Sequence, residues 1–333
     1  MDSISELRQD IVSGDWVVIA TGRAKRPQDF LKSKRKPFNQ PKTACPFEAM
    51  EKEPLLFYSH DGKNDSENWW VEAIPNKFPA FGKGVCETYE KKGPYKKKEG
   101  VGFHEVVVTR DHDRPLATMT EEEIELVIRV FQERYLALQA QPCIEYISIF
   151  QNQGASSGAS LSHPHAQIIA IPVVPPDIGR SLRGSVTYFQ EHNACVHCAV
   201  IEYEVSIKER IIYENEQMVV LSPYATKSAF EMRILPKQHN ARFETTVLKD
   251  RFALADALRN ALGKLYKGLD DPDYNFFLHT APVFGVEEYR HYHWHIEILP
   301  KTSIWAGFEI GTGIEISAVT PEAAAAFLRN IIL

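Results

Sequence analysis

The chain has 333 residues, of which 44% are hydrophobic and 25% charged, and its formal net charge is -6 at pH 7. These values are typical of a globular protein with a large core and either two domains or one fused pair. The negative charge argues against a general nucleic-acid-binding protein, and no apolar run approaches the roughly 20 residues that a membrane span needs. The N-terminus, "MDSISELRQDI", has neither the basic start nor the apolar stretch of a signal peptide, so we expect a cytoplasmic protein.

Segments rich in Val, Ile and aromatic residues predict that strands dominate the chain. In chain order they cover 15–21, 69–75, 104–109, 143–152, 166–172, 209–223, 230–236, 274–280 and 293–300. A helix is predicted from Thr120, where Glu123 completes a capping box, and two more over about 247–268 and in the C-terminal "PEAAAAFLRNII". The basic stretch at 90–100 has no periodicity and is expected to be a solvated loop.

One unit is repeated along the chain. The segments "HPHAQIIAIP" (163–172) and "HYHWHIEILP" (291–300) both begin H-x-H and end in proline. Aligning their first residues places His163 on His291, His165 on His293 and Gln167 on His295. Upstream, each half also carries a matching histidine and a C-x-x-[C/E] turn. We therefore expect two related domains, over residues 1–175 and 176–333.

The cysteines indicate metal binding. Five are present, an odd number, and two form "CVHC" at 195–198, which in a chain without an export signal favours metal or redox chemistry over a disulfide framework. Zinc prefers four ligands of the thiolate and imidazole type. The repeat therefore predicts one or two zinc ions per chain, held by Cys45, Glu48, His112 and His163 and by Cys195, Cys198, His239 and His291.

His165 is the candidate catalytic residue. On a strand it shares a face with His163 and Gln167. A neutral imidazole is a competent nucleophile toward phosphorus when its other nitrogen is fixed by an acceptor, and Gln167 could then donate to a phosphoryl oxygen. The preceding "NQGASSGAS" (152–160) suits phosphate oxygens because small residues expose backbone amides and hydroxyls. No such loop precedes His291, so we place the chemistry in the first half and expect His293 and His295 to be structural, supporting or vestigial.

Together these motifs resemble the galactose-1-phosphate uridylyltransferases of the histidine-triad superfamily. The resemblance rests on H-P-H-x-Q after F-x-N-x-G-x-x-x-G-x-S, on "WVVIATGRAKRP", and extends to "AGFEIGTG" (306–313). It implies an α+β fold of two fused histidine-triad-like halves, each a mostly antiparallel sheet with flanking helices. It also implies ping-pong transfer, in which His165 takes UMP from UDP-glucose and passes it to galactose 1-phosphate.

The same resemblance implies roles for further residues. Gln167 and Ser160 match phosphate-holding positions. The substrate-binding positions that it implies are Arg23 and Arg26 as phosphate-contacting arginines, Asn76 and Phe78 in the nucleoside-contacting segment, Asn152 and Gly154 in the Gly/Ser loop, and Phe308 and Glu309 in the hexose-binding segment. In this family the hexose-binding segment reaches in from a partner subunit, so a homodimer that shares the hexose site is implied. The expected small-molecule partners are a nucleotide sugar and a sugar phosphate, with no nucleic acid and no membrane.

Several residues depart from the family pattern. The first metal turn is Cys-x-x-Glu, the hexose segment reads Gly307-Phe308-Glu309 where well-known members have tyrosine, and Lys77 stands where some members are acidic. The second C-x-x-C and "AGFEIGTG" are closer to relatives that act as ADP-glucose phosphorylases.

Uridylyl transfer is our leading expectation and adenylyl transfer to phosphate is the alternative. A histidine-triad hydrolase is disfavoured because Gln167 cannot donate a proton as an imidazolium can. A zinc-stabilised binding module leaves His165 and its Gly/Ser loop unexplained.

Overall fold

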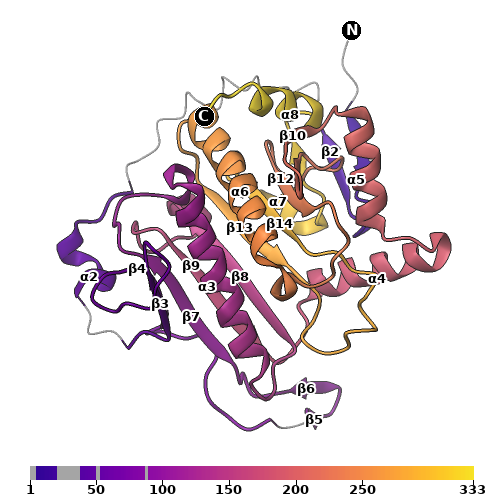
Figure 1. Ribbon diagram of the computed structural model, residues 1–333. Coiled ribbons are helices and arrows are strands. Elements are labelled where there is room, and N and C mark those ends of the chain that lie inside the picture. The colour runs from indigo at the N-terminus through magenta and orange to yellow at the C-terminus, as the bar shows by residue number, and fades with distance from the viewer. Residues whose placement is uncertain (1–4, 21–37, 50–52, 87–88) are drawn as a thin grey trace.

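Figure 1 shows the computed structural model, which describes residues 5–20, 38–49, 53–86 and 89–333. Its centre is a sheet of ten strands in the order β10-β11-β12-β14-β13-β8-β9-β7-β4-β3, with neighbouring strands antiparallel. The strands are β3 (Leu56–Ser59), β4 (Trp69–Pro75), β7 (Phe103–Thr109), β8 (Tyr146–Gln153), β9 (His165–Ile171), β10 (Ile211–Glu214), β11 (Met218–Leu221), β12 (Met232–Pro236), β13 (Tyr274–His279) and β14 (His295–Pro300). The expected α+β fold with an antiparallel sheet is confirmed.

The two halves join in the middle of this sheet. The first half contributes five neighbouring strands, β8, β9, β7, β4 and β3, and the second half contributes the other five, β10, β11, β12, β14 and β13. The halves meet where β8 pairs with β13. At this seam Asn152 lies opposite Asn275 and Phe150 opposite Phe277. Because the seam is a continuous hydrogen-bonded ladder, side chains of the second half can reach the Gly/Ser loop that follows β8.

Two long helices lie side by side across one face of the sheet (Figure 1). They are α3 (Glu121–Gln139) and α6 (Leu248–Leu269). The predicted capping box is present, since the Thr120 side chain accepts from the Glu123 amide and the Glu123 carboxylate accepts from the Thr120 amide. Buried residues of both helices and both halves form one continuous hydrophobic core, so the repeat has fused into a single packed unit.

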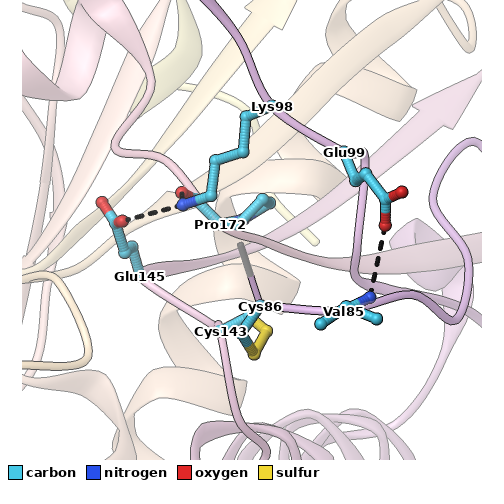
Figure 2. Close-up of a disulfide and its surroundings, with 7 residues drawn as sticks. All are labelled: Val85, Cys86, Lys98, Glu99, Cys143, Glu145 and Pro172. Carbon is cyan, nitrogen blue, oxygen red and sulfur yellow. Dashed lines mark hydrogen bonds and ion pairs between the residues drawn. A yellow bond between two sulfur atoms is a disulfide. The ribbon is translucent and has the colours of Figure 1, made fainter. Parts of the chain in front are cut away.

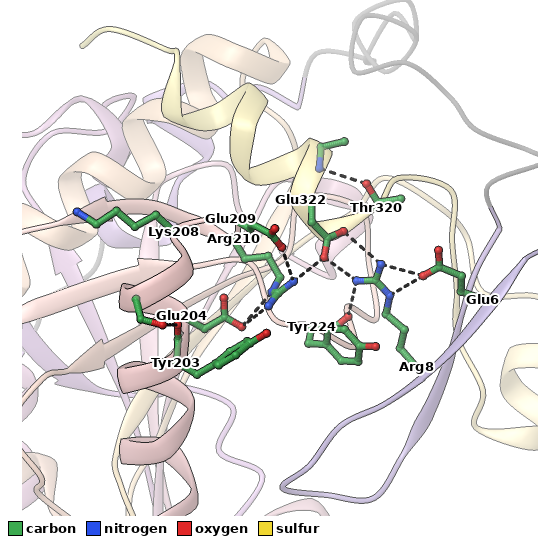
Figure 3. A network of polar contacts seen from close by, with 12 residues as sticks. Glu6, Arg8, Tyr203, Glu204, Lys208, Glu209, Arg210, Tyr224, Thr320 and Glu322 are labelled. Atoms are coloured by element: carbon green, nitrogen blue, oxygen red, sulfur yellow. Dashed lines mark hydrogen bonds and ion pairs between the residues drawn. The ribbon is translucent and has the colours of Figure 1, made fainter.

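The N-terminal strands lie against the second half. A small sheet joins β1 (Glu6–Gln9) and β2 (Trp16–Ile19) to β15 (Ile316–Ser317). Beside it, Glu322 of α8 (Pro321–Arg329) accepts hydrogen bonds from Arg8 at 2.8 Å and from Arg210 at 2.7 Å (Figure 3). Strand β1 and helix α8 are thus tied together. The division of the chain into domains of residues 1–175 and 176–333 stays a prediction.

Several elements differ from the expectation. Residues 90–100 form a hairpin, β5 (Glu90–Lys92) and β6 (Tyr95–Lys97), instead of a loop. The helices α4 (Pro176–His192), α5 (Val196–Ile207) and the short α2 (Pro46–Ala49) and α7 (Gly307–Thr312) were not predicted. Within the described ranges, no helix combines the length and apolar character needed to cross a membrane.

A disulfide joins Cys86 to Cys143, although the sequence favoured metal or redox chemistry over disulfides (Figure 2). The other three cysteines are free. The disulfide joins the segment before the basic hairpin to the turn that precedes β8. Lys98 strengthens this attachment, because its ammonium donates to the Pro172 carbonyl at 3.0 Å and lies 3.6 Å from the Glu145 carboxylate. The cysteine spacing gave no sign of this pair, since 57 residues separate its members.

Candidate active site

His165 opens β9, and the backbone determines which of its nitrogens carries the proton. Its Nδ1 lies 2.9 Å from the carbonyl oxygen of His163. Because a carbonyl can only accept, Nδ1 must be the protonated nitrogen and Nε2 must hold the free lone pair. The ring is 8% exposed, and this burial lowers its pKa despite the opposing effect of the hydrogen bond to His163. The imidazole is therefore neutral at neutral pH, with Nε2 available as a nucleophile.

Gln167 lies two residues along the same strand and face, as predicted. In the ladder it is opposite Val106 on one side and Phe150 on the other. Its side-chain oxygen lies 2.8 Å from Nε2 of His104, a residue that the sequence analysis missed. His104 shares the even-numbered face of β7 with Val106 and Val108, the residues opposite Gln167 and His165. That alternation in the predicted strand 104–109 is the signal that could have identified it.

The Gly/Ser loop is held in a defined shape by the second half. Gly154 and Gly158 adopt φ values of 82° and 90°, which favour glycine. From β13, Asn275 donates to the Asn152 side-chain oxygen at 2.7 Å and to the Ser157 carbonyl at 2.9 Å. The neighbouring Asp273 carboxylate accepts from the Ser156 amide at 2.6 Å.

These contacts refine the expectation for the loop. The amides of Ser156, Ser157 and Gly158 already donate within the chain. Ser160, by contrast, is exposed at the end of the loop, and its carbonyl accepts from the Gln40 side chain at 3.3 Å. Its hydroxyl is therefore the accessible polar group of the loop nearest to His165 in the chain.

The expected nucleoside-binding segment lies beside the same strands. Asn76 follows β4, and its backbone amide donates to the His104 carbonyl at 2.8 Å. Its side-chain oxygen accepts from the Phe78 amide at 2.8 Å, and the Phe78 ring is 82% exposed. An exposed aromatic ring on a fixed turn can stack on a ligand. Arg23 and Arg26 lie outside the described residues.

The four predicted ligands of the first metal site come together. Potential ligand atoms of Cys45, His112 and His163 lie within 4.8 Å of one another, and a Glu48 carboxylate oxygen is 3.4 Å from His112 Nδ1. His112 and His163 each direct Nε2 to a backbone carbonyl, of Gln40 and Thr109, so Nδ1 is the lone-pair nitrogen. Nδ1 of His112 is buried and makes no hydrogen bond to the described residues. This donor set fits a zinc ion.

The second group requires one correction to the prediction. Cys195, Cys198 and His239 are brought together as expected, but the fourth member is His293 instead of His291. Nδ1 of His293 lies 3.7 Å from the Cys195 sulfur and 3.6 Å from the Cys198 sulfur. Its Nε2 donates to the Pro236 carbonyl at 2.9 Å, the same arrangement as in the first group.

Strand register explains the error. Three histidines alternate at 291, 293 and 295, so the repeat could be aligned in two ways. His165 and His295 each begin a strand, and Nδ1 of His295 donates to the His293 carbonyl at 3.1 Å. His295 is therefore the counterpart of His165, His293 that of His163, and Glu297 that of Gln167.

The two cysteines of the second group differ in acidity. Hydrogen bonding, first from Cys198 and then from His239 and His293, lowers the pKa of Cys195 despite its burial, whereas the hydrogen bond with Cys195 and burial raise the pKa of Cys198. Cysteine binds zinc as a thiolate, the form that the lowered pKa of Cys195 favours. Bound there, a zinc ion would fasten the start of α5 to the strand ends at Pro236 and His293.

Phe308 and Glu309 lie on α7, in the second half of the chain. Glu309 accepts from the Ala306 amide at 3.0 Å, and Phe308 is 49% exposed. The end of α7 borders a cavity of about 700 Å³ that is lined mostly by residues of the second half, among them His295, and also by N-terminal residues such as Asp10 and Asp15. The expected contribution of this segment to a partner subunit stays a prediction.

Comparisons with known proteins agree with this geometry. A family model described as "Galactose-1-phosphate uridyl transferase, N-terminal domain" matches residues 1–175, and one described as "Domain of unknown function (DUF4921)" matches residues 97–330. An ADP-glucose phosphorylase from Arabidopsis thaliana is 36% identical over 98% of this chain and 93% of its own length. A galactose-1-phosphate uridylyltransferase from Thermotoga maritima is 31% identical over 98% of both chains. The crystal structure of ADP-glucose phosphorylase from Arabidopsis thaliana with bound ADP-glucose matches with a TM-score of 0.82, at 31% identity, over 99% of this chain and 100% of that one. This protein is therefore an enzyme that belongs to the galactose-1-phosphate uridylyltransferase family.

Proposed function

We propose that the protein transfers a nucleotidyl group from a nucleotide sugar through a covalent intermediate on His165. The observation that carries this proposal is the 2.9 Å hydrogen bond from His165 Nδ1 to the His163 carbonyl. It leaves Nε2 as the nucleophile and supports the positive charge that the ring acquires when Nε2 forms a bond to phosphorus.

The transfer has two steps. In the first, Nε2 attacks the α-phosphorus, the bond from that phosphorus to the sugar-phosphate oxygen breaks, and the sugar 1-phosphate leaves with the bonding electron pair. Gln167 and the hydroxyl of Ser160 would donate to the phosphoryl oxygens, where negative charge develops. In the second, an oxygen of the acceptor phosphate attacks the same phosphorus, which breaks the bond to Nε2 and restores the neutral imidazole.

The specific reaction that we propose is adenylyl transfer from ADP-glucose to inorganic phosphate. Glucose 1-phosphate would leave in the first step and ADP in the second. Support comes from the Arabidopsis thaliana ADP-glucose phosphorylase, which is 36% identical over nearly the whole chain. The crystal structure of an ADP-glucose phosphorylase from Arabidopsis thaliana, which has ADP-glucose bound, also supports this choice of substrate. The sequence motifs alone favoured uridylyl transfer to galactose 1-phosphate, and this reaction is the second candidate because a galactose-1-phosphate uridylyltransferase is 31% identical.

Metal, assembly and location complete the proposal. Zinc in the two Cys/His groups would stabilise the turns that carry them, without entering the transfer steps. We also propose a cytoplasmic homodimer in which Phe308 and Glu309 serve the hexose site of the partner. Asn76, Phe78, Asn152 and Gly154 would contact the nucleotide, with Arg23 and Arg26 on its phosphates.

Intact-protein mass spectrometry tests the proposal directly. The protein is incubated briefly with ADP-glucose or with UDP-glucose and no acceptor, and any adduct is mapped by peptide sequencing. We expect an AMP adduct on His165 that inorganic phosphate releases as ADP. The His165→Asn variant should form no adduct, whereas His295→Asn, which alters the equivalent histidine of the second half, should still form it. A UMP adduct alone would favour the second candidate, and an undiminished adduct in His165→Asn would refute the mechanism.

A further inference from the structure

His104 joins two parts of the site that are separate in the sequence. One is the segment from Asn76 to Ala80, which follows β4, and the other is Gln167 on β9. The Ala80 amide donates to His104 Nδ1 at 3.2 Å, and His104 Nε2 lies 2.8 Å from the Gln167 side-chain oxygen. Nδ2 of Asn76 contacts the same Nε2 at 3.0 Å. The imidazole therefore touches both the expected nucleoside-binding turn and the expected phosphate-holding amide.

The direction of these hydrogen bonds follows from simple chemistry. A backbone amide can only donate, so Nδ1 of His104 must be unprotonated and Nε2 must carry the proton. This N–H then donates to the oxygen of Gln167. The NH₂ group of Asn76 also can only donate, so its 3.0 Å approach to Nε2 is a contact and not a hydrogen bond in this tautomer. With its oxygen engaged, the amide of Gln167 presents its NH₂ group to any further partner.

That orientation decides whether Gln167 helps or hinders transfer. The two ends of a carboxamide have similar shapes and opposite hydrogen-bonding character, and rotation about the last side-chain bond exchanges them. An NH₂ group directed at the α-phosphate stabilises the charge on its oxygens, whereas the amide oxygen would repel them.

We propose that His104 is a positioning residue that fixes the Gln167 amide in its donating orientation and links it to the 76–80 turn. This inference rests on the proposed function, because it assigns His104 a role in the transfer at His165. Through this link, placement of the nucleoside on the turn and stabilisation of the phosphoryl group depend on the same ring.

Packing alone gives no reason for a histidine here. His104 is half-buried, and its even-numbered neighbours on β7, Val106 and Val108, are aliphatic. A phenylalanine would preserve the ring while removing its polar contacts with Ala80, Asn76 and Gln167. A glutamine could place its own NH₂ group near the position of Nε2 and so retain the donor to Gln167.

The test is a double-mutant cycle on the rate of adduct formation, measured by rapid quench and mass spectrometry with saturating ADP-glucose or UDP-glucose. We expect His104→Phe and Gln167→Ala each to slow formation by about tenfold to a hundredfold, which reaches the lower limit of the roughly hundredfold to thousandfold loss for removing one oxyanion donor. The double variant should be no slower than Gln167→Ala, because at saturating nucleotide sugar a loosened 76–80 turn weakens binding without slowing the bound complex, and the rate then depends on the amide through which His104 acts. His104→Gln should recover much of the lost rate, and His192→Phe, at an exposed helix end, should match wild type.

The outcomes separate this inference from the function on which it rests. Metal content and circular dichroism establish that each variant is folded. A wild-type rate in His104→Phe, or losses that multiply in the double variant, would overturn the role of His104 while leaving nucleotidyl transfer intact. A wild-type protein that forms no adduct with either nucleotide sugar would overturn the proposed function, and this inference with it.

Discussion

Replacing Glu322 by alanine should destabilise the protein because this carboxylate joins two buried arginines (Figure 3). It accepts from Arg8 at 2.8 Å and 3.3 Å and from Arg210 at 2.7 Å. The side chains of Arg8 and Arg210 are only 9% and 6% exposed, whereas that of Glu322 is 31% exposed. The change therefore removes the contact that ties the first strand to the last helix.

The magnitude follows from these contacts. A hydrogen bond to a charged group contributes about 1.5 to 3 kcal/mol when buried, and three such bonds are lost. Solvent screening at the partly exposed carboxylate reduces each contribution. Neither arginine is left unpaired, since Arg8 keeps Glu6 at 2.8 Å and Arg210 keeps Glu204 at 2.9 Å. We therefore expect a loss of about 2 to 3 kcal/mol in the free energy of unfolding.

Urea unfolding at pH 7 measures this loss, and the chain offers a matched control. Glu209 also lies beside Arg210, at 3.7 Å, but is 61% exposed. Glu209→Ala should change the free energy of unfolding by less than about 0.5 kcal/mol. Equal losses in the two variants would refute the reasoning, because Glu322 makes more contacts with the buried arginines than Glu209 does, and equal losses would show that neither the number of these contacts nor their burial sets the cost.

The same carboxylate predicts a pH dependence. Partial burial raises the pKa of Glu322, but hydrogen bonds from Arg8 and Arg210 outweigh it, and the net pKa is lowered. A lowered pKa in the folded state gives stability that is present above the ordinary carboxyl pKa of about 4 and is lost as the pH falls through the lowered value. The difference in stability between wild type and Glu322→Gln should therefore shrink below about pH 4, as urea midpoints across this range would show. A constant difference would contradict the sign.

Two further predictions concern the cysteines. Cys45→Ser and Cys198→Ser should each lose up to one zinc per chain, because each removes a thiolate from a different Cys/His group. Elemental analysis measures the metal content, and a full zinc content in both variants would contradict the assignment. Cys86→Ser should lower the free energy of unfolding by at most about 4 kcal/mol in non-reducing buffer, from the loop-closure entropy of a 57-residue separation. A reductant should then lower the free energy of unfolding of wild type and leave that of the Cys86→Ser variant unchanged. An equal free energy of unfolding for oxidised and reduced wild type would contradict the expected effect.

Local patterns in the sequence predicted what depends on local chemistry. The spacing of His165 and Gln167 placed these two residues on one face of β9, because neighbouring positions on a strand face opposite sides of the sheet. His163 precedes the strand, so the same rule does not apply to it. The capping box at Thr120 was predictable because both of its partners lie within one turn. The first metal group was predictable because its ligands belong to turns and strand ends whose order is repeated in the second half.

Other features depend on contacts between distant segments, and the sequence did not reveal them. Helix α4 contains Gly179 and Gly184, which weaken a helical pattern. The structure explains Gly184, because a Cβ atom there would lie 1.6 Å from the Val12 carbonyl oxygen, so the helix needs glycine where the N-terminal segment crosses it. The choice of His293 over His291 depended in the same way on where β14 begins, which no local pattern of alternating histidines can decide.

The two halves share the geometry around one histidine but differ in the residue beside it. In both His165 and His295, Nδ1 donates to the backbone carbonyl of the residue two positions earlier, at 2.9 Å and 3.1 Å. Two residues further on, the first half has the neutral amide of Gln167 and the second has Glu297, whose carboxylate lies 3.7 Å from His295 Nε2. Burial alone would raise the pKa of Glu297. Arg233, whose Nε lies 2.9 Å from a carboxylate oxygen of Glu297, instead holds this pKa well below its usual range.

A fixed carboxylate beside the histidine repels phosphate oxygens, so nucleotidyl transfer at His295 is disfavoured even though its nucleophile is correctly oriented. The second half contributes to the first site in another way. Across the β8–β13 seam, Asn275 holds Asn152 and the Ser157 carbonyl, while Asp273 holds the Ser156 amide. The Gly/Ser loop beside His165 thus takes its shape from a strand of the other copy. One continuous sheet is what makes this support available, because two separately folded copies would leave the loop without its anchors.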